Sequence, residues 1–306
     1  MNDRTTKIEL DPQEASAEGK PTSSDWGGLA WTPWVPFVGG DFRTLPASAG
    51  LYRVRVIGQD CLVYVGQTGR SLRERLRALR KHTLMQEMPF NDPHTAAPSL
   101  WAWAHAERFT FECSAACSTA ERSARLALES WLLWDHRVST GESTLCNHGG
   151  FHAGYKKSRN RSTGQRGGPI GGAPPEFRRI SISSAPLLAS GEFTGARWMG
   201  LHWTPWTSLK SVVQVSGKAL YRLRQAGGAE LLYIGETLRL NDRMAAHART
   251  YGGLEVEFSC AILPPDTSKS ALHELENDLL GCYFATFKRA PAHQFSNGRL
   301  GRTSAA

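Results

Sequence analysis

The chain has 306 residues, of which 41% are hydrophobic, and this is enough for the packed cores of about one to three domains. Its formal net charge of +8 and its pI of about 9.3 suit a polyanionic partner, although a basic surface also serves solubility alone. No secretory segment and no bilayer-length apolar run appears, so we expect a cytoplasmic protein without a membrane partner.

The first domain is expected over residues 26–150, after a polar tail over residues 1–25 that is predicted to be disordered. It opens with a segment over 26–42 that is rich in Trp, Pro and Gly. Trp31 and Trp34 are expected to pack against the domain, and base stacking is the less favoured interpretation.

A β-hairpin is predicted next, with strands over Leu51–Ile57 and Cys61–Gly66. Ser71 then caps a helix that extends to His82, and Glu74 completes a capping box. Apolar residues at helical spacing predict the buried face of this helix: Leu72, Leu76 and Leu79. The opposite face carries arginines for which phosphate contact and simple solvation are equally open: Arg73, Arg77 and Arg80.

Residues 88–99 are rich in proline and are expected to form a loop that the second half of the chain lacks. A third strand is predicted over Phe109–Cys113, and a helix over Thr119–Arg137 carries Glu129. Residues 151–195 are expected to be a basic linker, either on a nucleic-acid backbone or merely solvated. The cations assigned to nucleic-acid binding there are Lys156, Lys157, Arg159 and Arg161.

The second domain is expected over residues 196–306. Two apolar runs, Ala219–Leu223 and Leu231–Ile234, flank a Gly-Gly turn and predict another hairpin. A helix over Arg243–Arg249 places Arg243 and His247 one turn apart on one face. A strand over 254–258 and a helix over 268–287, which carries Glu276, complete the domain.

The second domain repeats the first. Tyr52 and Tyr64 recur as Tyr221 and Tyr233, both after 169 residues (221 − 52 and 233 − 64). Leu-Ala-Trp-Thr-Pro-Trp at 29–34 matches Leu-His-Trp-Thr-Pro-Trp at 201–206, and a Leu-Glu motif at 128–129 recurs at 275–276. Two copies indicate tandem domains and not a solenoid.

These motifs resemble the GIY-YIG nuclease superfamily, whose pattern is Gly-Ile-Tyr on one strand, Tyr-Ile-Gly on the next, an Arg in the following helix, and later a Glu and an Asn. The chain has Gly-Leu-Tyr at 50–52 and Tyr-Val-Gly at 64–66, then Ala-Leu-Tyr at 219–221 and Tyr-Ile-Gly at 233–235. The resemblance implies two catalytic sets, which are Tyr52, Tyr64, Arg75, Glu129 and Asn147 in the first copy and Tyr221, Tyr233, Arg243, His247, Glu276 and Asn297 in the second.

The resemblance also implies an α/β fold with two tandem small domains, each a three-stranded, mainly antiparallel sheet flanked by helices. Glu129 and Glu276 are then the ligands of Mg²⁺ (or Mn²⁺). Tyr221 would activate water only if cations stabilise its phenolate; otherwise it orients the water, and His247 is the other candidate for the base. The first copy has Leu79 at the position of His247.

The implied function is a divalent-metal-dependent endonuclease that hydrolyses phosphodiester bonds in DNA, with a duplex as the expected partner. Two sites in one monomer would imitate a two-fold dimer and cut both strands. The alternative is a protein in which one or both domains only bind or dock nucleic acid. Glu121 and Glu274 remain alternatives to the two metal-binding glutamates, and the six cysteines are expected to be buried free thiols more often than zinc ligands.

Overall fold

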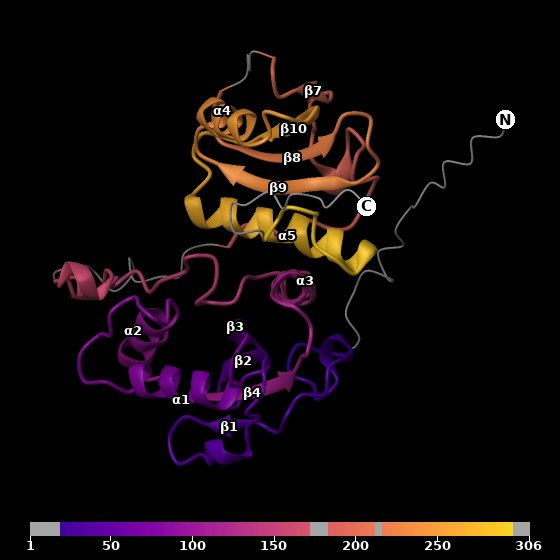
Figure 1. The fold of residues 1–306 in the computed structure, drawn as a ribbon. Helices are drawn as coiled ribbons and strands as arrows, with labels where there is room; N and C mark the ends of the chain where they lie inside the picture. Colours follow the sequence, from indigo (N-terminus) through magenta and orange to yellow (C-terminus); the bar gives the residue numbers. More distant parts are fainter. Residues whose placement is uncertain (1–18, 172–182, 212–215, 296–306) are drawn as a thin grey trace. The chain divides into compact units, whose positions relative to one another are not determined.

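The computed structural model describes residues 19–171, 183–211 and 216–295, and Figure 1 shows the fold. The described residues form an α/β protein with antiparallel sheets and five α-helices. Contacts divide the chain into two units. The N-terminal unit comprises Ala17–Arg125 and Asp135–Ala185, and the C-terminal unit comprises Leu126–Trp134 and the chain from Pro186 onwards.

The N-terminal unit contains a four-stranded sheet in the order β1-β4-β2-β3, in which every neighbouring pair is antiparallel. As the sequence predicts, β2 (Gly50–Val56) and β3 (Leu62–Thr68) form a hairpin. On the other side of β2 lies β4 (Phe111–Cys117). A fourth strand, β1 (Val35–Pro36), pairs with β4 at Cys113. The sheet therefore has one strand more than the three that were expected. Two residues are too few to show the alternation by which a strand is recognised.

The C-terminal unit repeats this sheet in the order β7-β10-β8-β9. Its hairpin consists of β8 (Ala219–Gln225) and β9 (Leu231–Thr237), and β10 (Val256–Ile262) and β7 (Thr207–Ser208) complete it. Ala219, which replaces the glycine of the first copy, lies in regular register between its two partner strands, so the methyl group does not disturb the sheet.

The helix after each hairpin forms as its sequence predicts. In α1 (Leu72–Thr83), the Ser71 hydroxyl accepts a hydrogen bond from the N–H of Glu74 at 3.2 Å. The predicted apolar stripe is buried: Leu72, Leu76 and Leu79. The equivalent helix, α4 (Leu240–Thr250), begins three residues earlier than expected.

The two longest helices are α3 (Arg122–Thr140) and α5 (Lys269–Phe287). The Ser268 side chain caps α5 by accepting from the N–H of Ala271 at 3.0 Å. In Figure 1, α5 runs along the hairpin of the C-terminal unit, and it packs on β8 and β9. Short 3₁₀ turns complete the described elements: η1 (Trp26–Gly28), η2 (Phe42–Thr44), η3 (Arg161–Thr163) and η5 (Trp198–Gly200).

The expected loop over residues 88–99 is partly wrong, because α2 (Ala97–Glu107) begins within it and packs against α1. Pro98 lies in the first turn, where a helix tolerates proline. The first seven residues of α2 are all buried, so this helix lacks the polar face that reveals a helix in a sequence. The following strand, β4, begins two residues later and ends four residues later than predicted.

A buried arginine holds the N-terminal segment of each unit. Arg53 donates hydrogen bonds to the carbonyl oxygens of Pro21 at 2.6 Å and Ser23 at 2.7 Å, and its guanidinium lies 4.3 Å from the centre of the Trp31 ring. Residues 19–25 are therefore ordered by this contact, in contrast to the expected disorder; residues 1–18 lie outside the described part. The Trp34 ring lies 4.8 Å from the same guanidinium, which supports the packing interpretation of the tryptophans.

Arg222 makes the same contacts in the C-terminal unit. It donates to the carbonyl oxygens of Phe193 and Gly195, and it lies 4.2 Å from the centre of the Trp203 ring and 4.8 Å from that of Trp206. Burial lowers the pKa of Arg53 and of Arg222 to about 9, so both remain charged at neutral pH.

Part of the expected linker is folded into the N-terminal unit. Tyr155–Lys156 (β5) and Gly168–Pro169 (β6) form a small antiparallel pair. The segment between them contacts the insertion before α2, since the N–H of Asn91 donates to the carbonyl of Arg159 at 3.1 Å. This part of the chain is therefore more than the linker that was expected over residues 151–195, and residues 172–182 lie outside the described part.

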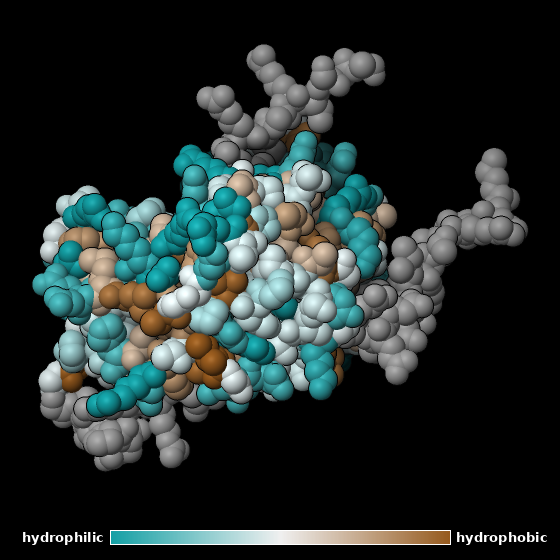
Figure 2. Space-filling model, turned by 90° about the horizontal axis from the view of Figure 1, so that it is seen from below, coloured by the Kyte–Doolittle hydropathy of each residue, from teal (hydrophilic) through white to brown (hydrophobic). Residues whose placement is uncertain are grey.

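Figure 2 shows one face of the molecule, on which hydrophilic residues surround smaller groups of hydrophobic residues. Among the described residues, no helix combines the length and the apolar character that crossing a membrane requires.

Each hairpin pairs its first tyrosine with a glycine on the opposite strand. Tyr52 lies opposite Gly66, and Tyr221 lies opposite Gly235. A Cβ atom at position 235 would come within 2.5 Å of Tyr221 Cζ and 2.7 Å of Tyr233 Cε1. The glycine is required because the two tyrosine rings fill the space over its Cα.

We predict that Gly235→Ala lowers the free energy of unfolding of the C-terminal unit by about 1–3 kcal/mol, the usual cost of overpacking. Urea denaturation followed by tryptophan fluorescence measures it. Gly253→Ala is the matched control, because a Cβ there meets nothing within 4 Å. Equal stability of the two variants would contradict the steric argument.

Candidate functional site

The C-terminal unit brings a tyrosine, an arginine and a histidine into direct contact. The Nε atom of Arg243 donates to the Tyr221 hydroxyl at 2.7 Å, and its Nη2 atom donates to the Tyr233 hydroxyl at 3.3 Å. The Nε2 atom of His247 lies 3.0 Å from the same Tyr221 hydroxyl. The helical spacing predicted from the sequence therefore places both α4 side chains on the tyrosine pair.

The hydrogen bonds define the direction in which a proton can move. The Tyr221 oxygen accepts from Arg243, so its own O–H can donate to the His247 ring. Burial and the neighbouring Arg243 lower the pKa of His247 to about 4, so the imidazole is neutral at pH 7 and can accept a proton.

Tyr221 is a phenol in this environment. Burial and the nearby Tyr233 raise the pKa of Tyr221 well above its ordinary value of about 10, although Arg243 acts in the opposite direction. Burial and Glu276 likewise raise the pKa of Tyr233. Of the two roles considered for Tyr221, orienting a water molecule therefore fits these residues better than acting as a phenolate base.

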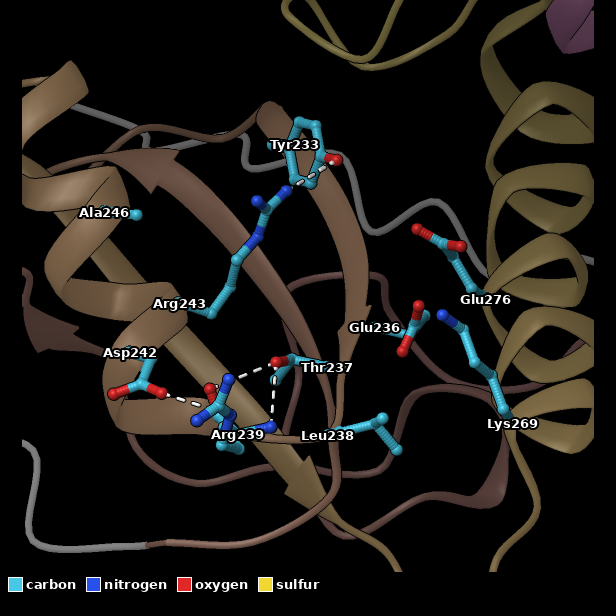
Figure 3. A pocket seen from close by; sticks show the side chains of 10 residues that line it. All are labelled: Tyr233, Glu236, Thr237, Leu238, Arg239, Asp242, Arg243, Ala246, Lys269 and Glu276. Carbon is cyan, nitrogen blue, oxygen red and sulfur yellow. Dashed lines mark hydrogen bonds and ion pairs between the residues drawn. The ribbon is translucent and has the colours of Figure 1, made fainter. Parts of the chain in front are cut away.

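A pocket of about 540 Å³ lies beside this cluster and belongs entirely to the C-terminal unit. Figure 3 shows Arg243 projecting from α4 toward Tyr233, while Glu276 and Lys269 project from α5 on the other side, and Glu236 lies between them. The predicted arginine, tyrosine and glutamate thus line one pocket. Glu274, the alternative to Glu276, is buried and is not part of the lining.

The pocket carboxylates fit a cation. Burial and the charge of Glu236 raise the pKa of Glu276 to about 7. The protein therefore does not fully stabilise the negative charge of the ionised carboxylate. Carboxylate oxygens are the ligands that Mg²⁺ prefers. Among the described residues no three His, Cys, Asp or Glu side chains form a metal-binding group. A divalent cation held by Glu276 and Glu236 would therefore take its other ligands from water or phosphate, which is usual for Mg²⁺.

In each unit, a side-chain amide that follows the long helix hydrogen-bonds to the backbone of an edge strand. Asn147 accepts from the Val65 N–H and donates to the Val65 carbonyl, both at 2.9 Å. Gln294 makes the same two contacts with Ile234 in β9, also at 2.9 Å. Among the described residues, Gln294 is therefore the counterpart of Asn147; the predicted Asn297 lies outside the described residues.

This counterpart was detectable from spacing alone. Asn147 follows Glu129 by 18 residues, and Gln294 follows Glu276 by the same number, whereas Asn297 follows by 21. An asparagine motif does not include this residue, although a glutamine side chain can form the same pair of backbone hydrogen bonds. In both units the amide pairs with the strand that carries the second tyrosine.

The N-terminal unit brings the predicted arginine and the two tyrosines together. The Nε atom of Arg75 donates to the Tyr52 hydroxyl at 3.2 Å, and the Tyr52 and Tyr64 ring centres are 5.9 Å apart. Leu79, in place of the histidine, is buried in the core. Glu129 is half-buried in Leu126–Trp134, the segment that groups with the C-terminal unit.

The two units also differ at a position that the sequence motif does not include. Glu236 in β9 lies opposite Leu220, and the residue at the same register in β3 is Gln67. The Nε atom of Arg125 donates to the Gln67 side chain at 3.3 Å. A neutral amide bound to a guanidinium therefore replaces one carboxylate of the C-terminal pocket.

The cations predicted to bind nucleic acid have mixed surroundings. Arg73 donates to the Leu45 carbonyl at 2.8 Å, and the Arg80 guanidinium lies 5.0 Å from the centre of the Phe42 ring, whereas Arg77 is exposed. Of the residues predicted in the basic segment, Lys157 is half-buried, and burial lowers its pKa. The exposed members of that segment are Lys156, Arg159 and Arg161.

The chain matches no protein-family description, no curated protein and no solved structure.

We predict that His247 makes the C-terminal unit less stable in acid. Its pKa is about 4 in the folded chain and about 6.5 when unfolded, so between pH 6.5 and 4 only the unfolded chain binds this proton. Stability attributable to His247 is complete above pH 6.5 and falls as the pH is lowered, with a slope approaching about 1.4 kcal/mol per pH unit.

Urea denaturation of the wild type and of His247→Gln between pH 4 and 8 measures this effect. The variant should lose less stability over the acid range, because the other histidines are the same in both proteins. Parallel stability curves would show that His247 is not the group responsible.

Proposed function

We propose that the chain is a divalent-metal-dependent endonuclease that hydrolyses phosphodiester bonds in DNA and whose best-formed GIY-YIG-type site lies in the C-terminal unit. The single observation that carries the proposal is the joint contact of Arg243 and His247 with the Tyr221 hydroxyl beside the pocket that Glu276 lines. The net charge of +8 supports a polyanionic substrate such as DNA.

Each contact has a role in the proposed reaction. Arg243, which is always protonated, stabilises the negative charge that grows on the phosphate oxygens. Tyr221 orients the attacking water and passes a proton along its hydroxyl to His247, so no free phenolate is needed. The water oxygen bonds to phosphorus, the bond to the leaving sugar oxygen breaks, and that oxygen takes a proton from solvent.

Glu276 and Glu236 would hold the cation next to the phosphate. When bound there, a divalent cation supplies charge stabilisation to the phosphate and to the leaving oxygen. Its positive charge would also favour the ionised form of Glu276, whose pKa is otherwise about 7.

We predict that the purified chain nicks supercoiled plasmid in Mg²⁺ and that EDTA abolishes nicking. Glu276→Gln should lower the rate of the C-terminal site about a hundred-fold, because an amide holds a cation far less well than a carboxylate. Glu255→Gln removes an exposed carboxylate of the same unit outside the pocket and is the control. Cutting by Glu276→Gln at the wild-type rate would reject the metal assignment.

A second candidate function is favoured by the differences between the units. In it, the C-terminal unit alone cleaves, and the N-terminal unit binds or docks the nucleic acid. Leu79 in place of His247 and Gln67 in place of Glu236 support this candidate, since both replacements remove groups that the proposed chemistry uses.

Substitution of the two helix arginines separates the candidates. If both units cleave, Arg75→Ala and Arg243→Ala should each leave a nicking enzyme, with nicks on opposite strands of an asymmetric duplex. Loss of a preorganised oxyanion donor typically costs about a hundred- to a thousand-fold in rate. If Arg243→Ala stops all cleavage and Arg75→Ala changes none, the second candidate is correct.

A further inference from the structure

The first copy of the motif lacks its histidine, and α1 cannot supply one at that position. Leu79 occupies the place in α1 that His247 occupies in α4, and it is buried with Tyr52 and Tyr64 in the core of the N-terminal unit. A proton acceptor for this site would therefore have to come from another part of the chain.

The insertion before α2 brings a histidine to the site. The Arg75 guanidinium donates through Nε to the Tyr52 hydroxyl at 3.2 Å and through Nη1 to the carbonyl oxygen of Pro93 at 3.3 Å. The next residue after Pro93 is His94. One guanidinium thus joins the first tyrosine of the motif to the peptide that precedes this histidine, and the C-terminal unit has no corresponding insertion.

His94 is held in place with an available nitrogen. Its side chain is 4% exposed, and its ring meets the ring of His82 edge to face at a centre-to-centre distance of 5.2 Å. Its Nδ1 atom is buried and has no hydrogen-bond partner among the residues that the structure describes. A buried polar atom without a partner is rare in a folded protein, and catalytic function is one of its recognised explanations.

The electrostatic setting of His94 matches that of His247. In both cases burial is the main cause of a pKa lowered to about 4, and the helix arginine is the next cause, Arg75 for His94 and Arg243 for His247. His82 contributes further at His94. Both rings are therefore neutral at pH 7, and each lies close to the arginine of its own unit.

We propose that His94 is the histidine of the N-terminal site and accepts the proton of the water that attacks the phosphate bound at Arg75. The water oxygen bonds to phosphorus, its proton passes to the His94 ring, the bond to the sugar oxygen breaks, and the leaving oxygen takes a proton from solvent. This inference rests on the proposed endonuclease function. It gives the first copy a histidine, which that copy lacks because Leu79 stands at the position of His247.

Strand-resolved cleavage tests the proposal with the full-length chain. An asymmetric duplex labelled on each strand is cut in Mg²⁺, and Arg75→Ala identifies the strand that belongs to the N-terminal unit. His94→Gly should lower cleavage of that strand at least about a hundred-fold, the low end for loss of a proton-transfer group. Cleavage of the other strand should persist, and this would show that the variant chain is still folded.

Chemical rescue distinguishes chemistry from packing. Added imidazole should restore cleavage of the affected strand at least tenfold in His94→Gly. His82→Gly is the matched control, since it removes the ring that contacts His94, and any loss it causes should not respond to imidazole. His94→Asn, which keeps a polar side chain, should show the same selective loss.

The outcomes that overturn the proposal are distinct. Unchanged or faster cleavage of the Arg75-dependent strand in His94→Gly, a loss without rescue, or loss of both strands in both His94 variants would each refute it. A wild type that cuts only a strand insensitive to Arg75→Ala would refute it while leaving an endonuclease. A wild type that cuts neither strand would reject the proposed function and this inference with it.

Discussion

The pairing of a strand tyrosine with a glycine on the neighbouring strand is the constraint on which each candidate site depends. Because Gly235 has no side chain, the rings of Tyr221 and Tyr233 can occupy the space over its Cα. Their ring centres lie 6.0 Å apart, which leaves both hydroxyls within reach of Arg243. A side chain at position 235 would displace the rings and with them the acceptors of the arginine.

The burial of the site's ionisable groups determines which chemistry they can perform. Burial raises the pKa of Tyr221 and Glu276 and lowers that of His247, so in each case it favours the neutral form. The charged Arg243 remains the fixed cation of the cluster. A neutral histidine, a protonated tyrosine and a permanent cation suit proton transfer from water beside an anionic substrate.

Duplication has given two units with a common scaffold and different sites. The strand order, the tyrosine–glycine pairs, the buried arginines Arg53 and Arg222 and the backbone-pairing amides recur in both. The differences lie where a substrate would be handled. Gln67 bound to Arg125 replaces a carboxylate, α2 packs against α1, and the insertion before α2 brings Pro93 to Arg75.

Local patterns in the sequence predicted the hairpins, the capped helix after the first hairpin and the buried stripe formed by Leu72, Leu76 and Leu79. These features depend on contacts within a few residues along the chain, and their spacing is visible without a structure. The pairing of Arg243 with His247 was predictable for the same reason, since one helical turn separates them.

The sequence by itself determined that the chain is duplicated, which residues recur, and where the hairpins and the helices α1, α3, α4 and α5 lie. Only the tertiary structure decided the edge strands β1 and β7, the helix α2, the burial of Arg53 and the arrival of His94 at Arg75. Each of these depends on contacts between segments that lie far apart in the chain, and no periodic pattern in the sequence indicates such contacts. The pKa values of the site also belong to this second group, because burial and neighbouring charge exist only once the segments have packed together.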